Sequence, residues 1–240
     1  YNNQINLISK PKKLGRNNFN VLNADFEPII ENDVIFFYDP RGNIYSYSLK
    51  NNKLIWEYNF YKKMYKNKPK EINFSISKNN LIISDNLGYV YSLNKKNGKI
   101  NWAKNYSVPF KSNIKIDDDN VFLLNQDNKF YVISEKNGNQ KLDLETFPSF
   151  LKTNRKTNIS LDRNNKNVYF VTSAGEIYSL NYKNRNINWF FSLSAVSSDK
   201  TIDLFYSSPI INKDNEVILS NAFSTFSMDS TNGLLNWEIA

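Results

Sequence analysis

The sequence predicts an all-β fold made of five repeated units of four short strands, and three observations support this prediction. A stretch of 15 residues with a common pattern recurs five times along the 240-residue chain. Short alternating and apolar runs follow one another in the same order in every unit. Residues typical of tight hairpins stand at one position of the repeat. Four-stranded units that recur about every 40 to 50 residues are typical of the blades of a β-propeller.

Four of the five stretches end on a tryptophan. GNIYSYSLKNNKLIW ends at Trp56, GYVYSLNKKNGKINW at Trp102, GEIYSLNYKNRNINW at Trp189 and FSTFSMDSTNGLLNW at Trp237. The third stretch, NKFYVISEKNGNQKL, places Leu142 at this position. Successive anchors are 46, 40, 47 and 48 residues apart, which is in or near the range of four-stranded propeller blades. We interpret the tryptophans as structural residues.

Each unit begins with a short alternating run and continues with a more apolar one. The first runs are 28–30, 74–76, 114–116, 159–161 and 209–211. The second runs are DVIFFY, NLIISD, NVFLLN, NVYFVT and EVILSN. A third strand follows with an aromatic residue, which is Tyr45, Tyr91, Tyr131, Tyr178 or Phe226. One ring per blade indicates a core position rather than a ladder for stacking a ligand.

The turn into the fourth strand has hairpin chemistry. Asn97-Gly98, Asn137-Gly138 and Asn232-Gly233 provide residues that accept a positive φ. Asn51-Asn52 fits as well, because asparagine tolerates the left-handed region. Asn184-Arg185 fits poorly, and we expect it to cost some stability. We expect residues 1–24 to be an N-terminal tether or partial edge strand and residues 25–240 the propeller. The expected blades cover about 25–60, 70–106, 112–146, 156–193 and 206–240.

Composition excludes several classes of function. The chain has no histidine and no cysteine, which excludes disulfides, thiolate metal sites and nucleophilic sites that depend on these residues. The net charge of +8 is spread along the chain and concentrates only in loops, which favours a solvated basic surface over a nucleic-acid interface. No run approaches the roughly 18 apolar residues of a membrane span.

The densest acidic run is Asp117-Asp118-Asp119-Asn120, at the link between the first two strands of the third unit. Its oxygen atoms are of the type that calcium prefers. Aspartate and asparagine also favour turns, and we expect a solvated turn here. The sequence therefore indicates no metal site, no cofactor site and no catalytic residue.

With the anchors aligned, the consensus of the units is G-x-[IV]-Y-S-L-[ND]-x-x-[NT]-G-x-x-x-W; four of the five units follow it well, and the third, which lacks the tryptophan, diverges. From about residue 26 to residue 240, this resembles the repeat of the pyrroloquinoline-quinone (PQQ)-type propeller family. The resemblance implies that Trp56, Trp102, Trp189 and Trp237 dock each blade against its neighbour. It also implies that the five units are part of an eight-bladed propeller, so the chain would be a fragment or a shortened relative.

The PQQ-type family includes dehydrogenases that use quinone, calcium, a catalytic aspartate and often a disulfide between adjacent cysteines. This chain has no cysteine and no recognisable calcium constellation. We therefore expect a non-catalytic protein-interaction scaffold. A PQQ- and calcium-dependent dehydrogenase-like protein and a luminal or periplasmic sensor domain are the alternatives.

Two loops resemble those of the BamB family, lipoproteins of the outer-membrane β-barrel assembly machinery. The loop before the fourth unit reads LETFPSFLK, and the link before the fifth reads DKTIDLFYSSPII. By this resemblance, Phe150, Leu151, Lys152 and Asp203 would bind a protein partner, the periplasmic domains of the barrel-assembly subunit. The implied location is the periplasm, at the inner face of the outer membrane. Membrane attachment would come only through a lipid anchor upstream of Tyr1.

Overall fold

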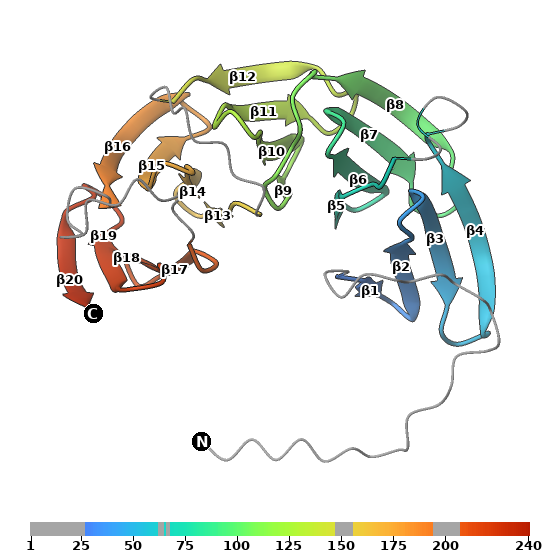
Figure 1. Ribbon diagram of the computed structural model, residues 1–240, viewed down its shortest axis with the longest axis horizontal. Coiled ribbons are helices and arrows are strands. Elements are labelled where there is room, and N and C mark those ends of the chain that lie inside the picture. Colours follow the sequence, from blue (N-terminus) through green and yellow to red (C-terminus); the bar gives the residue numbers. More distant parts are fainter. Residues whose placement is uncertain (1–26, 62–64, 66–67, 147–155, 194–206) are drawn as a thin grey trace, which may run out of the picture. The chain divides into compact units, whose positions relative to one another are not determined.

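The computed structural model describes residues 27–61, 65, 68–146, 156–193 and 207–240. These residues form twenty strands in five four-stranded antiparallel sheets, which we number blade 1 to blade 5 in chain order (Figure 1). Each sheet is a meander, so its first strand in sequence lies at one edge and its fourth at the other. The prediction of an all-β fold with five four-stranded units is confirmed. Within these ranges, no helix is long and apolar enough to cross a membrane.

The strands are short, as the alternating runs of the sequence predict. Blade 1 holds β1 (Ile29–Glu31), β2 (Val34–Tyr38), β3 (Asn43–Ser48) and β4 (Lys53–Asn59). Blade 2 holds β5 (Ile72–Ile76), β6 (Asn80–Asp85), β7 (Tyr89–Asn94) and β8 (Ile100–Asn105). Blade 3 holds β9 (Lys115–Asp117), β10 (Asn120–Leu124), β11 (Phe130–Ser134) and β12 (Gln140–Leu144). Blade 4 holds β13 (Ile159–Asp162), β14 (Asn167–Val171), β15 (Glu176–Asn181) and β16 (Asn186–Ser192). Blade 5 holds β17 (Ile211–Lys213), β18 (Glu216–Ser220), β19 (Thr225–Asp229) and β20 (Leu235–Ile239).

The chain divides into two compact units. Unit 1 is Tyr1–Pro69 and contains blade 1, and unit 2 is Lys70–Ala240 and contains blades 2 to 5. In blade 1, Phe37, Tyr45 and Tyr47 are buried together, and the rings of Phe37 and Tyr45 stack with centroids 5.0 Å apart. Buried aromatic side chains of this size supply much of the stability of a small sheet.

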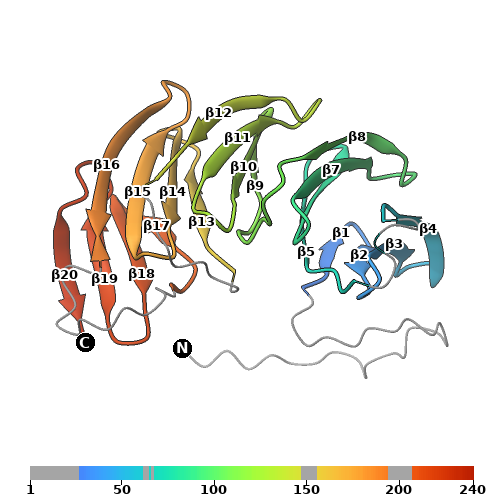
Figure 2. The same cartoon turned by 45° about the horizontal axis from the view of Figure 1, so that its top comes forward.

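In unit 2, apolar side chains from adjacent blades fill each junction between sheets, and the sheets of blades 3, 4 and 5 lie face to face (Figure 2). Val90 of blade 2 belongs to one buried cluster with Val121 of blade 3, Phe130 of blade 3 stacks on Phe170 of blade 4, and Ile177 of blade 4 belongs to one cluster with Val217 of blade 5. The first strands β5, β9, β13 and β17 line the inner edge of the unit (Figure 1). Each blade is therefore stabilised by its neighbour as well as by its own hydrogen bonds.

The hairpin between the third and fourth strands is the same in every blade. Its second turn residue has a positive φ: 54° at Asn52, 68° at Gly98, 68° at Gly138, 63° at Arg185 and 73° at Gly233. The third and fourth strands then pair with a β-bulge that falls at one position in all five blades. A bulge re-aims the side chain that follows it. Here the following residue is always the anchor of the repeat.

The residue opposite each tryptophan anchor is a serine. Ser46 pairs with Trp56, Ser92 with Trp102, Ser179 with Trp189 and Ser227 with Trp237, whereas Val132 pairs with Leu142. In three blades an asparagine occupies the bulge, and its amide lies 3.1 to 3.4 Å from the serine Oγ. Blade 1 has Ile55 at the bulge, and the buried Ser46 Oγ has no hydrogen-bond partner there. The bulge asparagine therefore satisfies a hydroxyl that burial would otherwise leave unpaired.

Candidate functional site

One edge of unit 2 carries all the turns between the second and third strands, and we call it the loop edge. These turns are 86–88, 125–129, 172–175 and 221–224. Because the strands are antiparallel, the fourth strand of each blade also ends there and the first begins there. Three hydrogen bonds show this for the fourth strands of blades 2, 3 and 4: Tyr106 N donates to Gly88 O at 2.8 Å, Thr146 Oγ1 to Asn128 O at 3.0 Å, and Leu193 N to Gly175 O at 2.8 Å.

The four residues expected to bind a partner lie outside the described residues. Phe150, Leu151 and Lys152 fall between β12 and β13, and Asp203 falls between β16 and β17. The described ends of β12 and β16 and the starts of β13 and β17 all lie at the loop edge. The assignment of these four residues to a partner stays a prediction.

The described part of the loop edge is held by polar contacts between blades 3 and 4. Ser173 N donates to Asn128 Oδ1 at 2.9 Å, and Asn128 Nδ2 donates to Ser173 Oγ at 2.9 Å. Both side chains are buried, so these two hydrogen bonds are shielded from water and hold the two turns together. These contacts therefore fix the turns of blades 3 and 4 relative to each other at the loop edge.

Charged and aromatic groups surround these turns. Lys129 Nζ lies 2.5 Å from Asp143 Oδ2 and 3.0 Å from Glu145 Oε1, and hydrogen bonds to both carboxylates raise the pKa of Lys129. Burial raises the pKa of Glu176, although Tyr178 and Thr172 donate hydrogen bonds to it. Phe223, in the blade 5 turn, is 69% exposed. Exposed aromatic rings and a charged periphery are both features of protein interfaces.

The acidic run of blade 3 is more than the solvated turn expected from the sequence. Asp118 is the exposed turn residue, with φ of 50°, whereas the Asp117 carboxylate is buried against blade 4. It accepts hydrogen bonds from Tyr182 Oη at 2.6 Å and Lys166 Nζ at 3.0 Å, and Arg163 Nε lies at 3.3 Å. The solvated-turn interpretation is therefore wrong for Asp117.

The partners of Asp117 set its protonation. Burial alone would raise the pKa of the carboxyl, but the hydrogen bonds from Tyr182 and Lys166 and the charges of Lys166 and Arg163 outweigh it. The pKa of Asp117 therefore lies below its ordinary value. Across the described ranges, no three acidic side chains come together in a way that could hold a metal ion. The network joins blades 3 and 4. It could not be predicted from the sequence, because its members are up to 65 residues apart in the chain.

Two of the four tryptophans contact the following blade through one geometry. Trp102 Nε1 donates to the carbonyl oxygen of Glu135 at 2.9 Å, and Trp189 Nε1 donates to that of Ser230 at 2.9 Å. Each ring lies on the glycine of the next hairpin. A Cβ added to Gly138 would be 2.5 Å from Trp102 Cε3, and one added to Gly233 would be 2.5 Å from Trp189 Cδ2.

The other three anchors differ in their surroundings. Trp56 is buried in unit 1, with its ring 6.1 Å from that of Phe36. Trp237, in the last strand, is 36% exposed, whereas Trp189 is 7% exposed. Leu142, the anchor of blade 3, is partly buried and packs against the apolar cluster between blades 3 and 4.

Comparison with known proteins identifies the family. The family model for outer membrane protein assembly factor BamB, a PQQ-type repeat, matches residues 63–240, well over half of the chain. The chain belongs to the BamB family. No curated protein matches the sequence. The predicted resemblance to PQQ-type propellers and to BamB is confirmed.

Solved structures agree on the fold. BamB from Moraxella catarrhalis superposes with a TM-score of 0.72 at 14% identity, covering 88% of this chain and 63% of that one. The chain thus spans less than two thirds of the length of that BamB. The quinohemoprotein alcohol dehydrogenase ADHIIG from Pseudomonas putida HK5 has a TM-score of 0.66 at 12% identity, covering 89% of this chain and 41% of that one. The designed protein Ika8 has a TM-score of 0.67 at 10% identity, covering 88% and 60%. These similarities confirm a β-propeller fold, which BamB shares with an enzyme.

Proposed function

We propose that this chain is a non-catalytic protein-interaction scaffold of the machinery that assembles outer-membrane β-barrel proteins. The match of residues 63–240 to the BamB family model carries this proposal. By the same relationship, the chain acts in the periplasm, at the inner face of the outer membrane. Its partner is the barrel-assembly subunit, whose periplasmic domains bind Phe150, Leu151, Lys152 and Asp203.

The chemistry of the described residues favours a scaffold over an enzyme. The chain has neither histidine nor cysteine. The most buried carboxylate of the acidic run, that of Asp117, is engaged by Lys166, Arg163 and Tyr182. Such a carboxylate supports the junction between two blades and is not available as a calcium ligand or a base. The loop edge of unit 2 carries an exposed aromatic ring, Phe223, in the blade 5 turn and charged groups around Lys129 in blade 3, and protein interfaces use both kinds of group.

Binding to the purified periplasmic domains of the barrel-assembly subunit, measured by titration calorimetry, tests the proposed partner. The double variant Leu151→Ala with Lys152→Ala should weaken the complex by more than about 1 kcal/mol. The matched control is Leu234→Ala with Lys136→Ala, an exposed leucine and lysine in the hairpins at the opposite edge. This control should leave the affinity unchanged. If both double variants bind the subunit with the same affinity as the parent chain, Leu151 and Lys152 do not belong to the binding site.

The enzyme alternative has its own direct test. A titration with pyrroloquinoline quinone and calcium, followed by the fluorescence of the four tryptophans, should show no saturable binding. Saturation at micromolar quinone, together with oxidation of an alcohol, would restore the dehydrogenase-like function and remove the scaffold proposal.

A further inference from the structure

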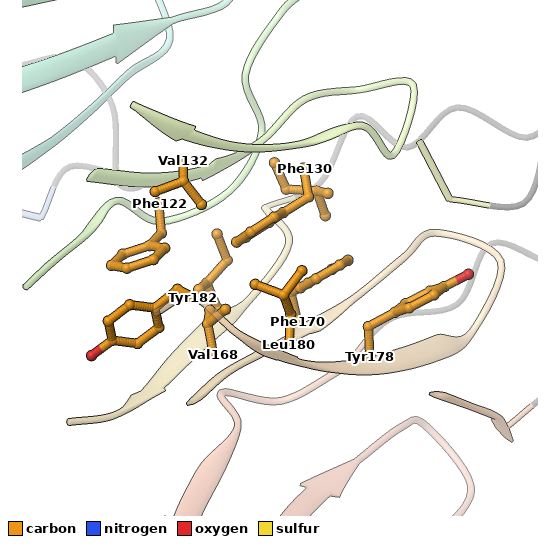
Figure 3. Close-up of a cluster of buried hydrophobic side chains, with 10 residues drawn as sticks. Phe122, Phe130, Val132, Val168, Phe170, Tyr178, Leu180 and Tyr182 are labelled. Atoms are coloured by element: carbon orange, nitrogen blue, oxygen red, sulfur yellow. The ribbon is translucent and has the colours of Figure 1, made fainter. Parts of the chain in front are cut away.

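The inner edge of unit 2 carries a partly buried lysine that has no acidic partner among the described residues. Lys115 begins β9 and pairs with Phe122 of β10, so its side chain lies on the face of blade 3 that packs against blade 4. Figure 3 shows Phe122 beside Tyr182 of blade 4, with ring centroids 4.9 Å apart. Lys115 forms neither an ion pair nor a side-chain hydrogen bond within the described residues, whereas Asp117, on the same strand, binds Lys166 and Tyr182.

Two further cations stand near Lys115. Arg163 follows β13, and its Nη2 donates to the carbonyl oxygen of Ile116 at 3.2 Å, which holds the guanidinium against β9. Its Nε lies 3.3 Å from Asp117 Oδ1, and its Nη1 makes no hydrogen bond within the described ranges. Burial lowers the pKa of Lys115, and the charges of Arg163 and Lys156 lower it further. A partly buried charge beside like charges costs folding free energy unless an anion compensates it.

The segments that precede β9 and β13 hold these cations in place. They run parallel to each other, with Ser112 and Thr157 paired in a bridge. Thr157 N donates to Lys111 O at 2.9 Å, and Asn113 N donates to Thr157 O at 3.2 Å. The side chain of Asn113 extends this pairing, since its Oδ1 accepts from Ile159 N at 2.9 Å. The cations are therefore carried by backbone that is hydrogen-bonded on both sides of the junction, as a binding site requires.

Thr157 adds a buried hydroxyl group to the same junction. It is 8% exposed, and its Oγ1 has no hydrogen-bond partner. Alternate residues of an extended segment point to one face, and Ile159 packs into the cluster between blades 3 and 4. Thr157 therefore faces the same junction as Lys115. Buried hydroxyl groups are hydrogen-bonded in the large majority of cases, so this one calls for an acceptor.

We propose that the inner edge between blades 3 and 4 binds a phosphate group through Lys115, Lys156 and Arg163, with the Thr157 hydroxyl as a further donor. A phosphate carries about two negative charges at neutral pH and has several acceptor oxygens, so it fits a group of cations and a hydroxyl better than a carboxylate does. Arginine is suited to such oxyanions because its guanidinium presents several N–H groups in one plane. The site uses none of the residues proposed to bind the barrel-assembly subunit, and it goes beyond the proposed function.

Isothermal titration calorimetry with inorganic phosphate, at an ionic strength kept constant with sodium chloride, tests this proposal. Lys115→Met keeps the apolar stem of the side chain and removes its charge, and it should weaken phosphate binding at least tenfold. Thr157→Val removes only the hydroxyl and should weaken binding at least threefold, whereas Lys115→Arg should retain the affinity within threefold. The matched control is Lys99→Met, an exposed lysine in the hairpin between β7 and β8, which should change the affinity less than twofold.

Thermal melts separate binding from a structural role of Lys115. Without phosphate, Lys115→Met should melt at or above the temperature of the parent chain, because it removes an uncompensated charge. With phosphate, the parent chain should gain stability and Lys115→Met should not. A lower melting temperature of Lys115→Met without phosphate would overturn the proposal, because the lysine would then have a stabilising partner. Equal phosphate binding by the parent chain and Lys115→Met would overturn it as well.

The source of the phosphate group is distinguished with the same variants. Vesicles of phosphatidylglycerol are compared with soluble inorganic phosphate, and vesicles of phosphatidylcholine are the control. Loss of inorganic phosphate binding alone in Lys115→Met indicates a free phosphate, and loss of binding to both ligands indicates that a lipid headgroup is also accepted. If sodium chloride at the same ionic strength stabilises the parent chain as much as phosphate does, the effect is general screening of positive charge and the site does not exist.

Discussion

The junctions on either side of blade 4 join blades of the same repeat in two different ways. Between blades 4 and 5, the Trp189 ring lies on Gly233 and its Nε1 donates to the Ser230 carbonyl. Between blades 3 and 4, Leu142 replaces the tryptophan, and the corresponding hairpin residue is Arg185. There the rings of Phe130 and Phe170 stack, and Asp117 binds Tyr182 and Lys166.

This difference explains why the hairpin residue is glycine in some blades and arginine in another. Both Gly233 and Arg185 have a positive φ, so the backbone alone does not decide the choice. A ring from the preceding blade occupies the space of a Cβ at Gly138 and at Gly233. Where the preceding anchor is Leu142, a side chain is present at the turn. The anchor of the preceding blade therefore determines which residue the hairpin can have. At Arg185 the positive φ strains the backbone, which costs about 1 to 3 kcal/mol.

The largest expected difference between the two junctions is the cost of removing their anchors. Trp189→Ala should lower the free energy of unfolding by about 3 to 5 kcal/mol, because a buried ring and its hydrogen bond are lost. Leu142→Ala should cost less, since its side chain is only partly buried. Urea denaturation of the two variants measures both values. Equal losses would mean that the two junctions do not differ as described.

A smaller effect should follow from adding one methyl group at the hairpin. Gly233→Ala brings a Cβ to 2.5 Å from the Trp189 ring and also strains the backbone. We expect a loss of about 2 to 4 kcal/mol from overpacking and strain together. Arg185→Ala keeps the same φ without any ring above it and should stay within about 0.5 kcal/mol. A loss at Arg185→Ala as large as at Gly233→Ala would contradict the role of the ring.

The polar part of the junction between blades 3 and 4 should depend on pH. Because the pKa of Asp117 is lowered in the folded chain, its ionised form stabilises the fold above the ordinary pKa of aspartate. This contribution is lost as the pH falls through the lowered value. Asp117→Asn should therefore cost about 2 kcal/mol at pH 7 and progressively less in acid. The exposed neighbour Asp118→Asn is the control, and a pH-independent loss at Asp117→Asn would show that the charge does not matter.

The sequence predicts the strands, their order and the hairpins, because these depend on residues that are close in the chain. The spacing of Trp102 and Trp189 sets the repeat, and Asn137-Gly138 marks a turn from local chemistry alone. From local chemistry alone Arg185 fits the turn poorly, and the reason why an arginine is accommodated there depends on Leu142, more than 40 residues earlier. The network of Asp117 with Tyr182 could not be predicted for the same reason.

The same division applies to the exposed Phe190 and to the residues proposed to bind a partner. The unusual Phe190 of β16 is apparent once the five repeats are aligned, since acids stand at its position in three of them. Its support by the stacked rings of Tyr178, Phe170 and Phe130 depends on the packing of blade 3 against blade 4. The partner residues Phe150, Leu151, Lys152 and Asp203 come from a family resemblance of two loops, and only binding measurements test them.

A double-mutant cycle tests most directly whether the anchor of one blade selects the hairpin residue of the next. Leu142→Trp, Arg185→Gly and the double variant are compared with the parent chain by urea denaturation. The account predicts that Leu142→Trp is destabilising alone and that Arg185→Gly relieves part of the loss, with a favourable coupling of at least about 1 kcal/mol. Effects that add within about 0.5 kcal/mol would contradict it, because the two positions would then be independent.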